Sequence, residues 1–266
     1  MDNGYVETNS QKLYYEIHGE GDPLLLIMGL GDDSTAWMLQ TPALAEHFKV
    51  IVFDNRDVGR SSEAKGPYTI KDMAEDTAGL MDGLGIKQAH VVGASMGGAI
   101  AQELVIAHPD TVRKLVLACT MGHFARFRIF MLESAKFVKE RDLDKKVFLG
   151  QLLFWCMTHA FLKDAEAVDQ MMDMMRNPPF PQSPEAFSRQ VDATMTFDAL
   201  DRLGSVKVTT LVLLGDQDIL TPPWAARELA GAIPAAKLQI LEGGAHGFLW
   251  EIPEKVNRAI IEFLKD

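Results

Sequence analysis

The chain has 266 residues, of which 47% are hydrophobic and 24% are charged, so it is long and apolar enough to form one substantial core. Its formal net charge of −11 argues against nucleic acid or an anionic membrane as the main partner. Its two cysteines lack a C-x-x-C spacing, so we expect neither a thiolate metal site nor a disulfide framework. Its first residues are polar and no run of about 18 apolar residues occurs, so we expect a cytoplasmic protein without a membrane span.

The first 120 residues alternate short apolar runs with longer helical patterns. Continuous apolar runs of strand length are typical of strands that are buried on both faces of a parallel sheet. Strands are expected at 5–8, 12–19, 24–29, 50–54, 90–95 and 115–120, and helices at 70–85 and 96–109. This alternation predicts an α/β fold.

The pattern changes after residue 120. Residues 122–200 read as helical, hold most of the phenylalanines of the chain, and are interrupted by the Pro-rich stretch 176–184. Strand-like runs return at 210–215 and 238–243, and an amphipathic helix closes the chain. We therefore expect a core formed by 1–121 and 201–266, with a helical lid at 122–200.

Ser95 lies in the sequence Gly93-Ala94-Ser95-Met96-Gly97, between an expected strand and an expected helix. This G-x-S-x-G pattern is typical of a nucleophile elbow, a sharp turn that exposes the serine hydroxyl. Larger side chains at the two glycine positions would prevent the close approach of strand and helix. Ser95 is therefore the predicted nucleophile.

A serine hydroxyl needs a base, and the base needs an acid that orients it. His246 lies in a Gly-rich loop after the last expected strand, at the edge of the sheet where ligands bind in α/β folds, and is the predicted base. Two carboxylates, Asp216 and Asp218, follow the strand at 210–215. We favour Asp218 as the acid because it is further out on the loop, and expect Asp216 to brace the loop.

An oxyanion formed at the nucleophile needs two backbone N–H donors. Met96 directly follows the nucleophile, and Leu30 lies in the loop after the strand at 24–29. These two residues are predicted to form the oxyanion hole.

Together these motifs resemble the α/β-hydrolase fold superfamily, in the branch that holds carboxylesterases, 3-oxoadipate enol-lactonases and cofactor-free haloperoxidases. The resemblance implies a mostly parallel sheet with a helical lid after the sixth strand. One departure is Met28-Gly29 in the oxyanion loop, where members often have His-Gly. The motifs are MGLGDDSTAW, FDNRDVGRSS, VVGASMGGAIAQELVIAHPDTVRKLVLACT, LLGDQDILTPP and GGAHGFLWEIP.

Some residues of the lid and of its surroundings must line a cleft over the carboxyl ends of the strands. Candidates for this lining are Trp37, His123, Phe124, Phe127 and Trp155. The Met and Phe content of the lid favours an apolar pocket.

The predicted activity is the hydrolysis of carboxylic esters of small to medium apolar substrates through an acyl-enzyme, without a cofactor or metal. The expected partner is a small-molecule ester or lactone, and a homo-oligomer is compatible with the sequence. One alternative is an enol-lactonase or a carbon–carbon bond hydrolase of aromatic degradation, for which Arg126, Arg128 or Arg189 would bind a substrate carboxylate. An alternative of another class is a non-enzymatic ligand receptor on the same fold.

Overall fold

The computed structural model describes residues 2–124, 126–141, 145–234 and 236–266. Eight strands form one sheet in the order β1-β2-β4-β3-β5-β6-β7-β8. β1 and β2 pair antiparallel, as do β2 and β4, and every other pair is parallel, which confirms the expected mostly parallel sheet. The strands are β1 (Asp2–Thr8), β2 (Gln11–His18), β3 (Pro23–Ile27), β4 (Lys49–Phe53), β5 (Ala89–Ala94), β6 (Val112–Ala118), β7 (Thr210–Gly215) and β8 (Ala236–Leu241).

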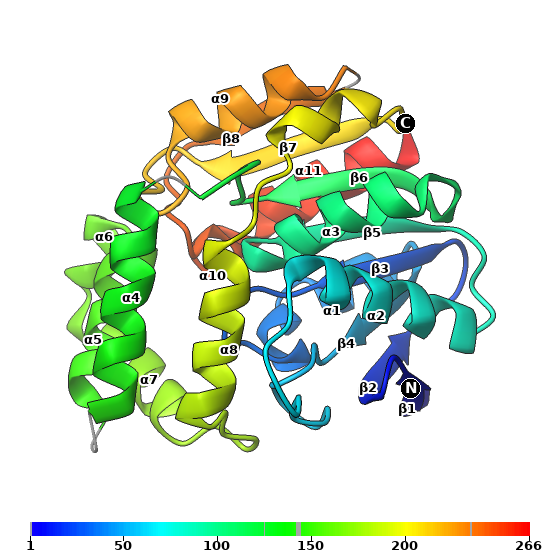
Figure 1. Ribbon diagram of the computed structural model, residues 1–266. Coiled ribbons are helices and arrows are strands. Elements are labelled where there is room, and N and C mark those ends of the chain that lie inside the picture. Colours follow the sequence, from blue (N-terminus) through cyan, green and yellow to red (C-terminus); the bar gives the residue numbers. More distant parts are fainter. Residues whose placement is uncertain (1, 125, 142–144, 235) are drawn as a thin grey trace.

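Helices cover both faces of the sheet (Figure 1). Successive residues of β3 show why this strand reads as a continuous apolar run: Leu25 and Ile27 belong to one core, whereas Leu24 and Leu26 belong to the other. The first core contains residues of α2 (Ile70–Gly83), α3 (Met96–Ala107) and α9 (Pro223–Ala232). The second contains residues of α1 (Thr41–Ala45), α10 (Phe248–Glu251) and α11 (Pro253–Lys265).

Short polar residues define where several helices begin. Thr69 and Asp72 form a reciprocal capping box at the start of α2.

None of the helices in the described part of the chain is both long and apolar enough to cross a bilayer.

A helical insertion follows β6, as expected, and stands beside the sheet in Figure 1. The Pro-rich stretch lies between its last two helices, and the short 3₁₀ helix η3 (Leu200–Ser205) leads from the insertion to β7. The insertion has a small core of its own, which includes Leu132, Phe148, Phe187 and Val191. Its helices are α4 (Arg126–Arg141), α5 (Lys146–Cys156), α6 (His159–Leu162), α7 (Ala165–Arg176) and α8 (Pro184–Met195).

Candidate active site

Ser95 occupies the single residue between the end of β5 and the start of α3. Its backbone has φ 54° and ψ −117°, a conformation that costs free energy for any residue with a side chain. Hydrogen bonds on both sides hold it there: its N–H donates to the Ala118 carbonyl at 2.9 Å, and the Thr120 hydroxyl donates to its carbonyl at 2.8 Å. Such strain, where it is held by the surroundings, marks a functional position.

The glycines around Ser95 allow backbone segments to touch. A Cβ at Gly93 would collide with the Gly97 carbonyl, and a Cβ at Gly97 would collide with the Ile27 carbonyl at the end of β3. The turn from β5 into α3 therefore requires glycine at both positions.

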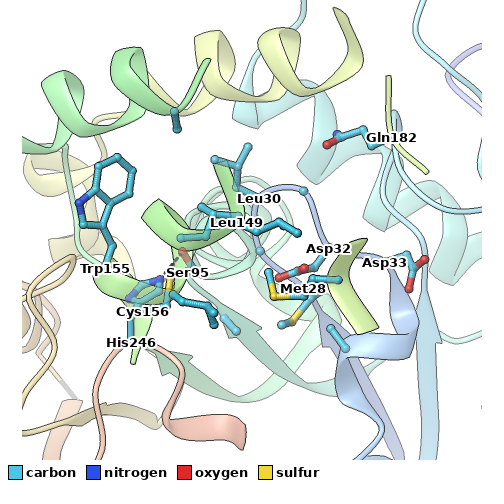
Figure 2. Close-up of a pocket in the computed structure, with 18 of the residues that line it drawn as sticks. Met28, Leu30, Asp32, Asp33, Ser95, Leu149, Trp155, Cys156, Gln182 and His246 are labelled. Carbon is cyan, nitrogen blue, oxygen red and sulfur yellow. Dashed lines mark hydrogen bonds between the residues drawn. The ribbon is translucent and has the colours of Figure 1, made fainter. Parts of the chain in front are cut away.

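His246 joins Ser95 to Asp218 through two hydrogen bonds, and Figure 2 shows its side chain beside Ser95. His246 Nε2 lies 3.0 Å from Ser95 Oγ, and His246 Nδ1 lies 2.9 Å from Asp218 Oδ2. An ionised carboxylate only accepts hydrogen bonds, so Nδ1 carries the proton and Nε2 offers its lone pair to the Ser95 hydroxyl. This hydrogen-bonded relay has the geometry needed to remove a proton from Ser95.

The Asp218 carboxylate is buried but well supplied with donors. It accepts hydrogen bonds from the backbone N–H groups of Leu220 and Thr221, each at 2.8 Å, and from the Thr221 hydroxyl at 2.5 Å. Burial by itself would raise the pKa of Asp218, but His246 and these Thr221 donors outweigh it and hold the pKa below its ordinary value. Asp218 is therefore kept ionised beside the imidazole.

The other loop carboxylate, Asp216, has a different place. It accepts a hydrogen bond from the Gly243 N–H at 2.8 Å and so ties the loop after β7 to the loop after β8. This is the bracing contact that was expected of it, and the structure brings Asp218 rather than Asp216 to His246.

Two supporting residues were not found from the sequence. Thr221 positions Asp218, and Glu251 accepts hydrogen bonds from the N–H groups of Ala245 at 2.8 Å and Thr158 at 2.7 Å. Glu251 thereby links the loop of His246 to the helical insertion. Most of these contacts run through backbone N–H groups, which leave no signature in side-chain patterns.

The predicted oxyanion donors lie next to Ser95. The Met96 N–H is at the first position of α3, where a helix has no internal acceptor, and the Leu30 N–H meets no acceptor among the described residues. Gly29 brings the Leu30 loop against the nucleophile, because a Cβ there would lie 3.1 Å from Ser95 Cβ.

The loop that carries Leu30 is held from two sides. Asn55 Nδ2 donates to the Met28 carbonyl at 3.1 Å, and the Gly31 N–H donates to Gln190 Oε1 on α8 at 3.0 Å. Polar side chains from the loop after β4 and from the insertion therefore fix this loop where members of the resembled family often use a histidine.

A pocket of about 330 Å³ opens above Ser95 and His246. Leu, Met, Phe and Pro side chains from the insertion form much of its wall. The charged residues that line it within the described ranges, apart from His246, are Asp32, Asp33, Arg128 and Lys139. The pocket is therefore apolar with a few charged positions, as expected for a small-molecule site.

Of the five predicted lining residues, only Trp155 borders this pocket (Figure 2). The prediction for Trp37 was wrong: its side chain is fully buried in the core on the α11 side of the sheet. An aromatic residue just after the oxyanion loop can point inward as readily as outward, and hydrophobicity does not distinguish the two.

The other three predicted lining residues also lie elsewhere. Phe124 packs against Phe197 with ring centroids 6.0 Å apart, and Phe127 packs against Trp224 at 6.1 Å. His123 lies 3.7 Å from Glu228 through its Nδ1 atom. These residues contact α9 and the segment before η3, so their lining role is corrected to a packing role.

The three candidate arginines have three different settings. Arg126 is exposed, and Arg189 donates two hydrogen bonds to the buried carboxylate of Asp57, at 2.9 and 2.7 Å. Arg128 alone lines the pocket.

The guanidinium of Arg128 has unusually few partners. The residue is 4% exposed, and its Nε and Nη1 atoms are buried without a hydrogen-bond partner among the described residues. The group lies over the ring of Phe124, 5.4 Å from the centroid, and burial lowers its pKa. An arginine remains protonated even so, and a positive charge therefore borders the pocket.

Comparison with known proteins agrees with this fold. The chain is 32% identical over 265 residues to a protein of Azorhizobium caulinodans named carbamate hydrolase RutD, covering 97% of each. It is 35% identical over 256 residues to a protein of Mycobacterium tuberculosis named non-heme bromoperoxidase BpoC, covering 94% of this chain and 97% of the relative. The crystal structure of the enol-lactonase from Burkholderia xenovorans superposes with a TM-score of 0.89 at 26% identity, covering 99% of this chain and 100% of that one. Residues 22–253 match the alpha/beta hydrolase fold family, and the chain belongs to that family.

Proposed function

We propose that the protein is a serine hydrolase that cleaves carboxylic esters through an acyl-enzyme on Ser95. The observation that carries this proposal is the relay of 3.0 and 2.9 Å hydrogen bonds from Ser95 through His246 to the ionised Asp218. It lies at a strained turn, beside the backbone N–H groups of Met96 and Leu30 and a largely apolar pocket.

In the first half of the reaction, Ser95 Oγ bonds to the carbonyl carbon of the substrate while its proton passes to His246 Nε2. Asp218 stabilises the resulting imidazolium through Nδ1–H. The Met96 and Leu30 N–H groups donate to the oxyanion. The tetrahedral species then expels the alcohol, which takes the proton from Nε2, and the acyl group stays on Ser95.

In the second half, water takes the place of the alcohol. It attacks the acyl carbon while His246 Nε2 accepts its proton, and the oxyanion is bound by the same two donors. Collapse of this second intermediate breaks the bond to Ser95 Oγ, which recovers the proton from His246. The carboxylic acid is released and the enzyme returns to its starting state.

The pocket wall supports small to medium apolar acyl or alcohol groups as substrates, since each buried methylene contributes about 0.8 kcal/mol to binding. Carbamates, which the name of one relative mentions, have a carbonyl that the same relay could attack.

Arg128 favours a second candidate, in which the substrate is a lactone that carries a carboxylate. A buried guanidinium without hydrogen-bond partners in the described part of the chain is complementary to such an anion. The named enol-lactonase with a similar fold makes this class worth including in the assay.

A fluorophosphonate probe, followed by peptide mass spectrometry, tests the proposed nucleophile. It should label Ser95 and abolish turnover of p-nitrophenyl esters, and Ser95→Ala should lose both the labelling and the turnover. Ser205→Ala, at an exposed serine, is the matched control and should keep both. Labelling of another serine, or normal turnover by Ser95→Ala, would overturn the proposal. Labelling of Ser95 without turnover of any ester, carbamate or lactone would favour the ligand-receptor alternative.

A further inference from the structure

One face of α4 forms a wall of the pocket and is charged at both ends. Arg128, Leu132, Ala135 and Lys139 are spaced four, three and four residues apart, and all four line the pocket. From Arg128 to Lys139 is 139 − 128 = 11 residues, or about 16 Å along the helix axis at 1.5 Å per residue. The charge of Asp218 acts on the pKa of Arg128, so the Arg128 end of this wall is the one near the relay, and Lys139 lies at its other end.

Lys139 reaches this end of the pocket without a carboxylate partner. Its ammonium lies over two aromatic rings, 5.0 Å from the centroid of Phe148 and 4.7 Å from that of Phe187. Within the described ranges no ion pair forms at Lys139, whereas Lys136, one turn earlier, binds Asp192 at 2.7 Å. The two rings thus face the Lys139 ammonium, which donates no hydrogen bond to the residues that the structure describes.

Asp32 supplies the opposite charge at the same pocket. Figure 2 shows it apart from Ser95 and His246. Its neighbour Asp33 caps η1 (Ser34–Trp37) by accepting the Thr35 N–H at 2.9 Å. The carboxyl group of Asp32 accepts no hydrogen bond from the residues that the structure describes. Its acceptor sites remain open to a ligand.

Asp32 and Lys139 form no ion pair with each other, but the charge of each affects the pKa of the other. Burial, with a smaller effect of Asp33, raises the pKa of Asp32 to about 7, and Lys139 opposes this change. Burial lowers the pKa of Lys139 to about 8, and Asp32 opposes that change in turn. Desolvated charges without a partner are costly, so two opposite charges that line one pocket are suited to a ligand that binds both.

We propose that Asp32 and Lys139 form a subsite for a net-neutral polar group, such as a carboxamide, at the end of the substrate remote from the scissile bond. The Asp32 carboxylate accepts the N–H of this group, and the Lys139 ammonium donates to its carbonyl. A carboxylate end group would be repelled by Asp32, and an ammonium end group by Lys139. The subsite deepens the proposed function and rests on it.

The substrates that test this subsite are p-nitrophenyl esters of matched acyl length that differ only at the far end. Their end groups are a carboxamide, an alkyl group of the same shape, a carboxylate and an ammonium. Several acyl lengths are compared, and acetate esters of alcohols with the same four ends cover the opposite orientation. At the best length the carboxamide should exceed the alkyl group in kcat/KM by at least about tenfold, which is the effect of one of the two charge-assisted hydrogen bonds alone.

Two variants change the preference in opposite directions. Asp32→Asn should move it toward the carboxylate end group, because Lys139 remains while the repulsion is removed. Lys139→Met should move it toward the ammonium end group. Lys136→Met is the matched control, with the same substitution on the same helix at a residue paired with Asp192, and should keep the wild-type ratio.

Turnover of the unsubstituted acetate ester separates this inference from the proposed function. If that ester is cleaved but the four end groups react alike in both series, the subsite is refuted; an equal loss of preference in Lys136→Met refutes it as well. If no ester is cleaved, the proposed function fails, and calorimetry with the carboxamide-ended and alkyl-ended acids still decides the subsite. Equal affinity of the wild-type protein for these two acids would overturn it.

Discussion

Replacing Arg128 by methionine should stabilise the fold and, at the same time, weaken the reaction with anionic substrates. The side chain is almost fully buried, and two of its nitrogens have no hydrogen-bond partner among the described residues. Its charge is compensated by a cation–π contact with Phe124 and by the attraction of Asp218, which favours the charged form. Methionine keeps much of the apolar stem and removes the charge.

The magnitude follows from the balance of these contributions. An effective desolvation penalty of several kcal/mol per buried ion is offset by about 2 kcal/mol from a desolvated cation–π contact and in part by the attraction of Asp218. Arg128→Met should therefore gain about 1–3 kcal/mol and raise the Tm by several degrees, at about 2–4 °C per kcal/mol for a domain of this size class. Loss of a charged hydrogen bond to a substrate carboxylate should lower kcat/KM about 10- to 100-fold.

Differential scanning calorimetry and kcat/KM on an anionic enol-lactone, beside an uncharged ester, measure the two effects. Arg126→Met, an exposed residue two positions earlier, is the control and should change neither. A lower Tm for Arg128→Met, together with equal kinetic losses on both substrates, would refute the reasoning and make Arg128 a structural residue. A higher Tm with no selective loss on the lactone would remove the support for the lactonase candidate.

Three further predictions concern the two loop carboxylates, two glycines and Asp32. Asp218→Asn should lose several orders of magnitude in kcat, about 10⁴ by analogy with serine proteases, whereas Asp216→Asn should mainly lower the Tm; similar kinetic losses would reverse the assignment. Gly97→Ala should lower both Tm and kcat because its Cβ meets the Ile27 carbonyl, while Gly231→Ala in α9, where nothing lies nearby, should gain about 0.5–1 kcal/mol in denaturant unfolding. Asp32→Asn should raise the Tm at pH 8 but not at pH 4. The pKa of Asp32 in the folded protein is about 7, above the ordinary value of an aspartate, so ionisation of Asp32 destabilises the fold as the pH rises from the ordinary pKa to the folded-state pKa. A difference in Tm that does not depend on pH would contradict this.

The fold and the relay could be predicted from the sequence because their signals are local. The inner parallel strands β3, β4, β5 and β7 are buried on both faces and read as apolar runs, and the elbow needs glycine on both sides of Ser95 within five residues. The carboxyl ends of parallel strands lie at one edge of the sheet, so loops that are far apart in sequence bring Asp218 and His246 to this serine.

The pocket wall could not be predicted in the same way. Trp37 and Trp155 are equally apolar, yet the first is buried under the sheet and the second borders the pocket, because the orientation of each depends on packing between distant elements. Asp32 and Lys139 lie on a loop and a helix that are far apart in the sequence, and neither has a motif around it. The role of Arg128 depends on the partners that it lacks, which only the packed structure reveals.

The helical insertion ties the choice of substrate to the geometry of the relay. Its α8 holds the oxyanion loop through Gln190, and the Cys156 carbonyl at the end of α5 accepts the N–H of Gly247 beside His246 at 2.6 Å. The same insertion supplies Arg128 and Lys139 to the pocket wall. A movement of these helices that admits a larger substrate would therefore also displace the loops that carry the base and one oxyanion donor. Substitutions in the insertion should accordingly change kcat and KM together rather than KM alone.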